Sequence, residues 1–160
     1  MKISLVMATY NGAKYLNEQL DSIKNQTLKL DEVIIVDDVS TDDTSYLVEK
    51  YISNHQLNWI FIKNEKNLGY KGNFKKGLAH ASGDVIFLCD QDDVWMLGKR
   101  KAVINVFANQ QQCALVVHDA EVIDAKGNLT HASFMNLRGG FESAVFYNIL
   151  RNRYLGCAMA

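Results

Sequence analysis

The sequence has 160 residues, of which 48% are hydrophobic and 22% are charged, which is the balance of one globular domain. The formal net charge is −1. General nucleic-acid binders typically carry an excess of basic residues, so this charge argues against that class of protein. No apolar run approaches the roughly 18–20 residues of a membrane-spanning helix, and the composition excludes the disordered and fibrous classes.

Strand-like and helix-like segments alternate over most of the chain. Short apolar or β-branched runs predict buried strands, and apolar residues at helical spacing predict the helices between them. The predicted strands are residues 2–9, 32–37, 59–62 and 85–89, and the predicted helices are 14–26, one that starts at 40–43 and one that ends at 82–83. At 40–43 a hydroxyl cap, Ser40 or Thr41, precedes the acids Asp42 and Asp43, which is typical of a helix N-terminus.

The pattern changes after residue 98. We expect a helix over 98–109, a strand over 114–117, a hairpin in which 121–124 pairs with the segment from Leu129 onward, and a last helix over 141–151. Strands that alternate with helices imply βαβ units. The predicted fold class is therefore α/β, a Rossmann-like, mostly parallel central sheet flanked by helices.

Ligands of such sheets bind beyond the carboxyl ends of the strands. The most informative segment there follows the fourth predicted strand, where Asp90, Asp92 and Asp93 occupy three of four positions. Adjacent carboxylates resist ionising together, and a hard cation such as Mg²⁺ or Mn²⁺, bound with a diphosphate, would relieve that repulsion. A solvated acidic turn that caps a helix is the alternative interpretation.

Two more polar segments end predicted strands. Thr9, Tyr10 and Asn11 offer a ring on which a nucleotide base could stack, although a plain strand-to-helix turn explains them equally well. Asp37 and Asp38 end the second strand, and one carboxylate could accept a hydrogen bond from a base or from ribose. Helix capping is the alternative for this pair.

A glycine-containing loop over 67–73 precedes the third helix. It could approach a nucleotide closely, and Lys71 could face a phosphate. The loop matches neither the P-loop nor the dinucleotide-binding glycine pattern, so it is weak evidence by itself. The shared position of these segments at the strand ends is what favours a nucleotide site.

Three ordered motifs within residues 2–124 resemble those of family 2 glycosyltransferases, which have the GT-A fold: SLVMATYNG, EVIIVDDVSTDDT and NEKNLGYKGNFKKGLAHASGDVIFLCDQDD. The resemblance implies that the nucleotide is held by Thr9, Tyr10, Asn11 and Asp38, with Asp37 beside it. It implies a D-x-D element formed by Asp90, toward the ribose, and Asp92, on the metal. Asn67 and Lys71 would lie along the nucleotide edge.

The resemblance also implies an activity, which is inverting, metal-dependent sugar transfer. The donor would be a UDP- or dTDP-sugar and the acceptor a saccharide or lipid-linked saccharide. The metal would stabilise the departing diphosphate, and a carboxylate would deprotonate the acceptor hydroxyl. The variant D-Q-D-D-V-W resembles a bacterial rhamnosyltransferase-like subgroup that builds cell-surface polysaccharides. We expect a cytoplasmic location, and peripheral association with the cytoplasmic face of the inner membrane is a further hypothesis.

The family places the catalytic base well downstream of the D-x-D element, and no carboxylate follows Glu142 in this sequence. We therefore name no base. We expect residues 1–160 to form a single nucleotide-sugar-binding domain that is truncated on its acceptor side. A fragment that binds a nucleotide sugar without transferring it is the alternative.

Two other classes place aspartates after parallel strands. Residues 90–94 match the D-x-D-x-[TV] motif of haloacid-dehalogenase-like phosphatases, with Asp90 as nucleophile and Asp92 as general acid. That motif normally opens a chain, whereas 89 residues precede it here. A receiver-like signalling domain needs its acidic pair after the first strand, which here ends in Thr-Tyr-Asn.

Overall fold

A four-stranded parallel sheet forms the centre of the computed structural model, in which residues 1–137 are described. The strands are β1 (Ile3–Thr9), β2 (Glu32–Asp37), β3 (Ile60–Lys63) and β4 (Val85–Cys89), in the spatial order β3-β2-β1-β4. All three pairings are parallel, so the carboxyl ends of the strands share one edge. The predicted parallel α/β sheet is confirmed.

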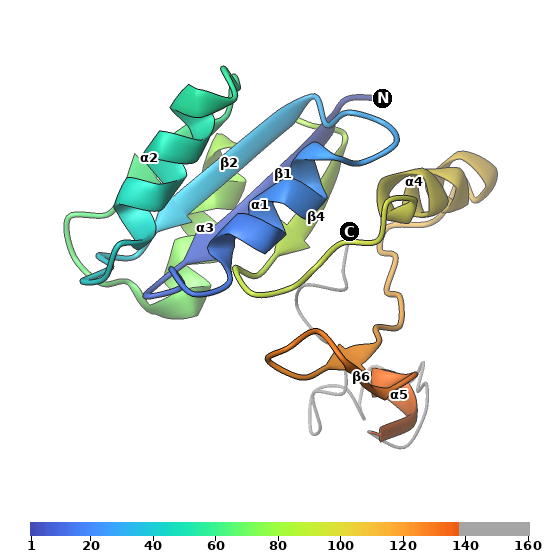
Figure 1. Cartoon of the computed structure of the whole chain (residues 1–160). Coiled ribbons are helices and arrows are strands. Elements are labelled where there is room, and N and C mark those ends of the chain that lie inside the picture. The colour runs from blue at the N-terminus through green and yellow to red at the C-terminus, as the bar shows by residue number, and fades with distance from the viewer. Residues whose placement is uncertain (138–160) are drawn as a thin grey trace.

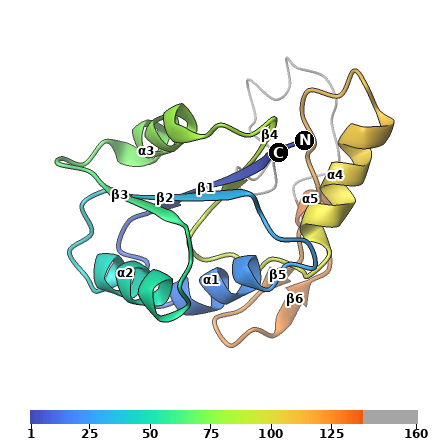
Figure 2. The same ribbon diagram turned by 90° about the horizontal axis from the view of Figure 1, so that it is seen from above.

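Helices cover both faces of this sheet (Figures 1 and 2). α1 (Leu16–Lys24) and α2 (Thr44–Asn54) lie on one face, and α3 (Gly69–His80) lies on the other. Successive side chains of a strand point to opposite faces, and both sets are buried. In β1, Leu5 and Met7 belong to the larger core cluster, and Val6 belongs to a smaller cluster that Phe74 of α3 covers.

The second helix begins later than the sequence indicates. The predicted cap at Ser40 or Thr41 is wrong, because α2 begins at Thr44 and its N-cap is Asp43. Asp42 accepts the Thr44 N–H at 3.0 Å. The Ser40 hydroxyl is engaged elsewhere, with Asp37 and with the Asn11 N–H.

The chain after β4 forms α4 (Lys99–Asn109), an antiparallel hairpin of β5 (Val122–Ile123) and β6 (Leu129–His131), and α5 (Phe134–Leu137). The predicted helix over 98–109 and the hairpin are confirmed. The predicted strand over 114–117 is wrong, because this segment runs from α4 to the hairpin without joining the sheet, and only Val117 forms an isolated bridge (Figure 1). The predicted helix over 141–151 lies outside the described residues.

None of the helices within residues 1–137 has the length and apolar character needed to cross a membrane.

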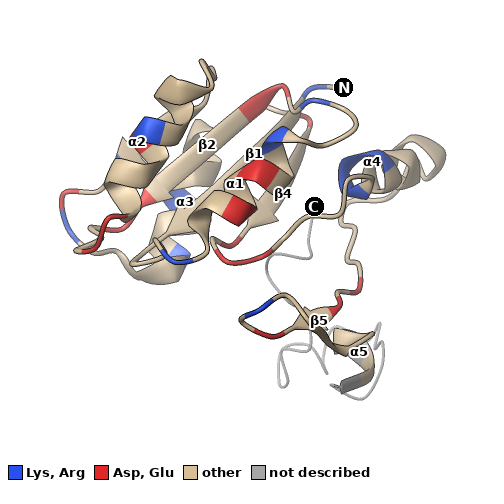
Figure 3. Ribbon diagram, viewed as in Figure 1, with Lys and Arg blue, Asp and Glu red and all other residues tan. Residues whose placement is uncertain are grey.

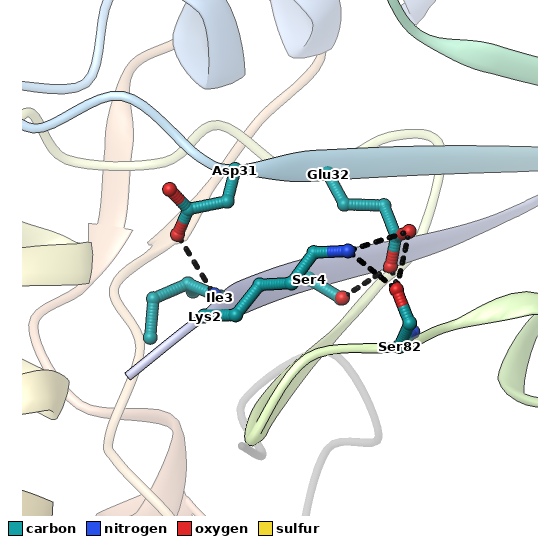
Figure 4. Close-up of polar contacts among 6 residues, drawn as sticks. All are labelled: Lys2, Ile3, Ser4, Asp31, Glu32 and Ser82. Carbon is teal, nitrogen blue, oxygen red and sulfur yellow. Dashed lines mark hydrogen bonds and ion pairs between the residues drawn. The ribbon is translucent and has the colours of Figure 1, made fainter.

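A polar network ties the amino ends of the strands together (Figure 4). Glu32, at the start of β2, accepts hydrogen bonds from the hydroxyl groups of Ser4 and Ser82 and from the Ser82 N–H. The Lys2 ammonium lies 3.4 Å from the same carboxylate. These donors, the Ser4 hydroxyl most of all, lower the pKa of Glu32 to about 2. The network lies at the sheet edge opposite the carboxyl ends, so its role is structural.

Glu32 should therefore stabilise the fold in a pH-dependent way. Its pKa is about 2 in the folded chain against an ordinary value of 4.5, so its contribution is present above pH 4.5 and is lost as the pH falls toward 2. Because the site is close to solvent, we expect this contribution to be on the order of 1–2 kcal/mol. Urea titrations at neutral and acidic pH should show that Glu32→Gln removes this part of the acid sensitivity. The exposed Glu65→Gln should keep it, and equal acid sensitivity in both variants would contradict the assignment.

Candidate functional site

A cleft of about 510 Å³ lies at the carboxyl ends of β1, β2 and β4. Acidic segments gather where β2 and β4 end (Figure 3). The cleft brings together six of the residues that the sequence singles out: Thr9, Tyr10, Asp38, Asn67, Asp90 and Asp92. The prediction that polar segments from separate strands meet at one edge is therefore confirmed, while their individual roles stay predictions.

Three predicted residues do not line this cleft: Asn11, Asp37 and Lys71. Asp37 is only 1% exposed, and its carboxylate accepts hydrogen bonds from the hydroxyl groups of Thr9, Ser40 and Ser45 and from the Ser40 N–H. These contacts join the end of β1 to the end of β2 and hold the start of the β2–α2 loop. In this structure Asp37 positions the cleft wall.

Asn11 also makes hydrogen bonds within the protein and does not line the cleft. Its φ of 49° places it in the left-handed region, which asparagine tolerates better than most residues. Its Oδ1 accepts the Thr41 N–H at 2.8 Å, and its own N–H donates to Ser40 Oγ at 2.9 Å. The turn after β1 is thereby fastened to the loop after β2, which places Tyr10 at the cleft.

Asp38 presents one carboxylate oxygen for a ligand. Its Oδ1 accepts hydrogen bonds from Asn64 Nδ2 at 2.7 Å and from the Leu68 N–H at 2.8 Å, which use both lone pairs of that oxygen. Within residues 1–137, Oδ2 accepts no hydrogen bond. Since Asp38 lines the cleft, Oδ2 is the atom that a bound N–H or O–H donor would meet.

Gln91, to which the sequence pattern assigns no role, fastens the end of β4 to the turn after β1. Its Nε2 donates to the Tyr10 carbonyl at 2.9 Å, and its Oε1 accepts the Tyr10 N–H at 2.8 Å. A Cβ on Gly12 would lie 2.2 Å from Gln91 Oε1, so glycine at position 12 leaves room for this amide. The only sequence signal was its place between Asp90 and Asp92.

The acidic end of the cleft carries unfavourable electrostatics. Burial, and then the charges of Asp93 and Asp92, raise the pKa of Asp90 to about 6. Oδ2 of Asp93 is buried without a hydrogen-bond partner among the described residues. Crowded carboxylates that resist ionisation are typical of a place where a cation binds.

The residues present fit a small divalent cation. No cluster of three or more His, Cys, Asp or Glu side chains able to hold a metal occurs within the described chain. Mg²⁺ is usually bound by one or two carboxylates together with phosphate oxygens of the substrate. Asp90 and Asp92, which face the same cleft, supply that number of ligands.

Tyr70 and Lys71 differ from what the sequence indicates. Lys71, expected to face a phosphate, is exposed, and its Nζ lies 5.7 Å from the ring centroid of Tyr70. Tyr70 itself lines the cleft, although the sequence pattern did not indicate a role for it. The available signal was an aromatic residue directly after Gly69 in the 67–73 loop.

A second cleft, of about 380 Å³, meets the first at Asp92, which lines both. Its other walls come from Tyr15 and Glu18 near the start of α1 and from the hairpin turn 124–127. Asp92 is thus accessible from two sides.

Comparisons of sequence place the chain among known proteins. The model of glycosyl transferase family 2 matches residues 4–159. An uncharacterised glycosyltransferase of Bacillus subtilis, YwdF, is 39% identical over 124 residues, which are 77% of this chain and 43% of that protein. Abequosyltransferase RfbV of Salmonella typhimurium is 38% identical over 95 residues, which are 58% of this chain and 28% of that protein.

Solved structures of two glycosyltransferases are similar to this chain. S. aureus TarS 1–349 in complex with UDP is 33% identical, with a TM-score of 0.62 over 69% of this chain and 33% of that one. Mannosyltransferase PcManGT from Pyrobaculum calidifontis, in complex with GDP-Man and Mn²⁺, has a TM-score of 0.68 over 90% of this chain and 48% of that one. At 22% identity this second likeness shows the fold alone.

The chain spans less than half the length of each of these proteins. The match over nearly all of its residues leaves the phosphatase and receiver alternatives without support. This chain belongs to glycosyltransferase family 2 and has the α/β fold of the GT-A enzymes.

Proposed function

We propose that this chain binds the donor in a metal-dependent, inverting glycosyltransferase that moves a sugar from a nucleoside diphosphate to a saccharide or lipid-linked saccharide acceptor. The observation that carries the proposal is one cleft that joins Asp38 at the end of β2 to Asp90 and Asp92 after β4. TarS, whose structures contain UDP and UDP-GlcNAc, supports a nucleotide-sugar donor.

The geometry of Asp38 favours a UDP- or dTDP-sugar. Uracil and thymine carry one ring N–H, which needs a single acceptor, and Oδ2 is the free oxygen of Asp38. Guanine presents two adjacent N–H donors, which are best received by a carboxylate with both oxygens free. Thr9, Tyr10 and Asn67 line the same cleft and would contact the nucleotide, whereas Asn11 and Asp37 hold the cleft in shape.

Asp92, with Asp90, would hold Mg²⁺ or Mn²⁺ at the diphosphate end. The bound metal supplies Lewis-acid stabilisation of the departing diphosphate. The protein contributes two carboxylates that directly follow β4, and the amide of Gln91 between them is hydrogen-bonded to the Tyr10 backbone. We assign no catalytic base.

Further parts of the proposal rest on the family alone. We propose that residues 1–160 form a single nucleotide-sugar-binding domain, that the product is a bacterial surface polysaccharide, and that the enzyme works in the cytoplasm. A chain that binds the donor without transferring the sugar is the second candidate, because it spans only a fraction of its relatives. Release of nucleoside diphosphate from a nucleotide sugar in the presence of acceptor separates the two.

A thermal melt tests donor binding directly. The chain would be melted with UDP, dTDP or GDP, each with Mn²⁺ or with EDTA. Ligand at 100 times its Kd stabilises by about 2.7 kcal/mol, which for this chain length raises Tm by roughly 5–10 °C. We expect that shift with UDP or dTDP and Mn²⁺, and a smaller one with EDTA. A shift with GDP alone would contradict the base assignment, and no shift with any nucleotide would contradict the proposed function of this chain.

A further inference from the structure

Tyr70 stands on backbone that is tied to Asp38. The Leu68 N–H donates to Asp38 Oδ1 at 2.8 Å, and Asn67 Nδ2 donates to the Asp38 carbonyl at 3.1 Å. Asn67 Oδ1 accepts the N–H of Gly69 at 3.0 Å. Tyr70 follows directly, so its Cα is placed relative to Asp38 by three hydrogen bonds. The side chain lines the cleft although the residue is 71% exposed.

Two tyrosines line the cleft, and different segments hold them in place. The Tyr10 backbone exchanges two hydrogen bonds with Gln91, between Asp90 and Asp92, and the Thr9 carbonyl accepts the Asp38 N–H at 2.9 Å, so Tyr10 is held between the two ends. Tyr70 is connected to Asp38, at the end opposite the acidic one. If the diphosphate lies at the acidic end, the base lies at the end where Tyr70 stands.

The exposed ring offers a flat apolar surface at that end. Covering an aromatic side chain is favourable, because it removes a large apolar area from water. The Tyr70 ring is not covered and faces an open cleft. The Lys71 ammonium, 5.7 Å from the ring centroid, lies within the range of a cation–π contact. A planar base can stack on the face that the lysine does not occupy.

We propose that Tyr70 stacks on the nucleobase of the donor while Asp38 Oδ2 accepts a hydrogen bond from the edge of that base. The inference rests on the proposed function and adds to it a residue that holds the base by its face. Stacking does not distinguish one base from another, so Tyr70 would supply affinity and Asp38 would supply selectivity.

The test is calorimetric titration of this chain with UDP and Mn²⁺. Stacking on an aromatic side chain accounts for about 1–3 kcal/mol per base, so we expect Tyr70→Ala to raise the Kd of UDP by roughly 5- to 150-fold. Tyr70→Phe, which keeps the ring, should restore binding to within about 2-fold of the unchanged chain. Inorganic pyrophosphate has no base, so in the presence of Mn²⁺ it should bind the Tyr70→Ala variant and the unchanged chain equally.

Tyr46→Ala is a matched control. Tyr46 is 59% exposed, lies on α2 away from the cleft, and has the Lys50 ammonium 5.5 Å from its ring centroid. Tyr46 therefore resembles Tyr70 in its exposure and its lysine contact but does not line the cleft. The Tyr46→Ala variant should bind UDP as the unchanged chain does.

The outcomes separate the two proposals. If the unchanged chain binds none of UDP, dTDP and GDP, the proposed function and this inference both fail. If it binds UDP and Tyr70→Ala behaves like Tyr46→Ala, only this inference is overturned. An equal loss of UDP and pyrophosphate affinity in Tyr70→Ala would also overturn it, because the effect would not come from the base.

Discussion

Replacing Asp92 with asparagine should abolish Mn²⁺-dependent UDP binding and leave the fold intact. Asp92 is exposed and lines both clefts, so its carboxylate is not needed for packing. Asparagine keeps the shape and removes the charge that a hard cation requires. We expect the gain in UDP affinity on adding Mn²⁺ to fall by at least about 100-fold, because loss of a residue that only supports a metal ligand already costs about 10- to 100-fold. Titrations with Mn²⁺ and with EDTA measure this gain, and circular dichroism checks the fold.

Two other aspartate variants make that result interpretable. Asp43→Asn changes an exposed carboxylate at the start of α2 that makes no capping hydrogen bond, so metal dependence should persist. Asp38→Ala should weaken UDP binding both with Mn²⁺ and with EDTA, because Asp38 serves the base. Undiminished metal dependence in Asp92→Asn would refute the metal assignment, and an Asp38→Ala effect confined to stability would favour a purely structural role for that carboxylate.

Gly77→Ala should destabilise the fold strongly although alanine is the better helix former. A Cβ at position 77 of α3 would lie 2.3 Å from Val6 Cγ1 and 3.2 Å from Val36 Cγ2. Both valines are fully buried in the sheet and cannot turn away. Overpacking costs about 1–3 kcal/mol, and an approach as close as 2.3 Å places this change in the upper half of that range, above the gain of about 1 kcal/mol in helix propensity. We expect the free energy of unfolding to fall by about 1–2 kcal/mol net, measured by urea denaturation.

A double variant identifies the contact responsible. Val6→Ala removes the methyl group that the new Cβ meets, so the pair Val6→Ala and Gly77→Ala should cost less than the sum of the single changes. Lys75→Ala, on an exposed position of the same helix, should change stability little. A Gly77→Ala chain as stable as the original would show that α3 moves away from the sheet more easily than its packing indicates.

Local pattern was enough to predict most of the fold. The β-branched run at 32–37 and the apolar runs at 2–9 and 85–89 each predicted a strand of the sheet. Alternation of strand and helix then implied parallel order, which places the ends of β1, β2 and β4 at one edge. The pattern failed at 114–117, because an apolar run becomes a strand only where a neighbouring strand pairs with it over several residues, and in this segment only Val117 forms a bridge.

The sequence by itself determined which segments end at the site, because strand ends follow from local periodicity and three of the four residues 90–93 are aspartates. Only the tertiary structure decided which side chains face the cleft. Asp37 and Asp38 are neighbours, yet Asp37 turns inward to four donors while Asp38 keeps one oxygen free. Tyr70 enters the cleft because long-range hydrogen bonds to Asp38 place the start of α3 there. The directions of these side chains depend in part on partners that are distant in the sequence, Thr9 for Asp37 and both Asn64 and Leu68 for Asp38, which local pattern does not contain.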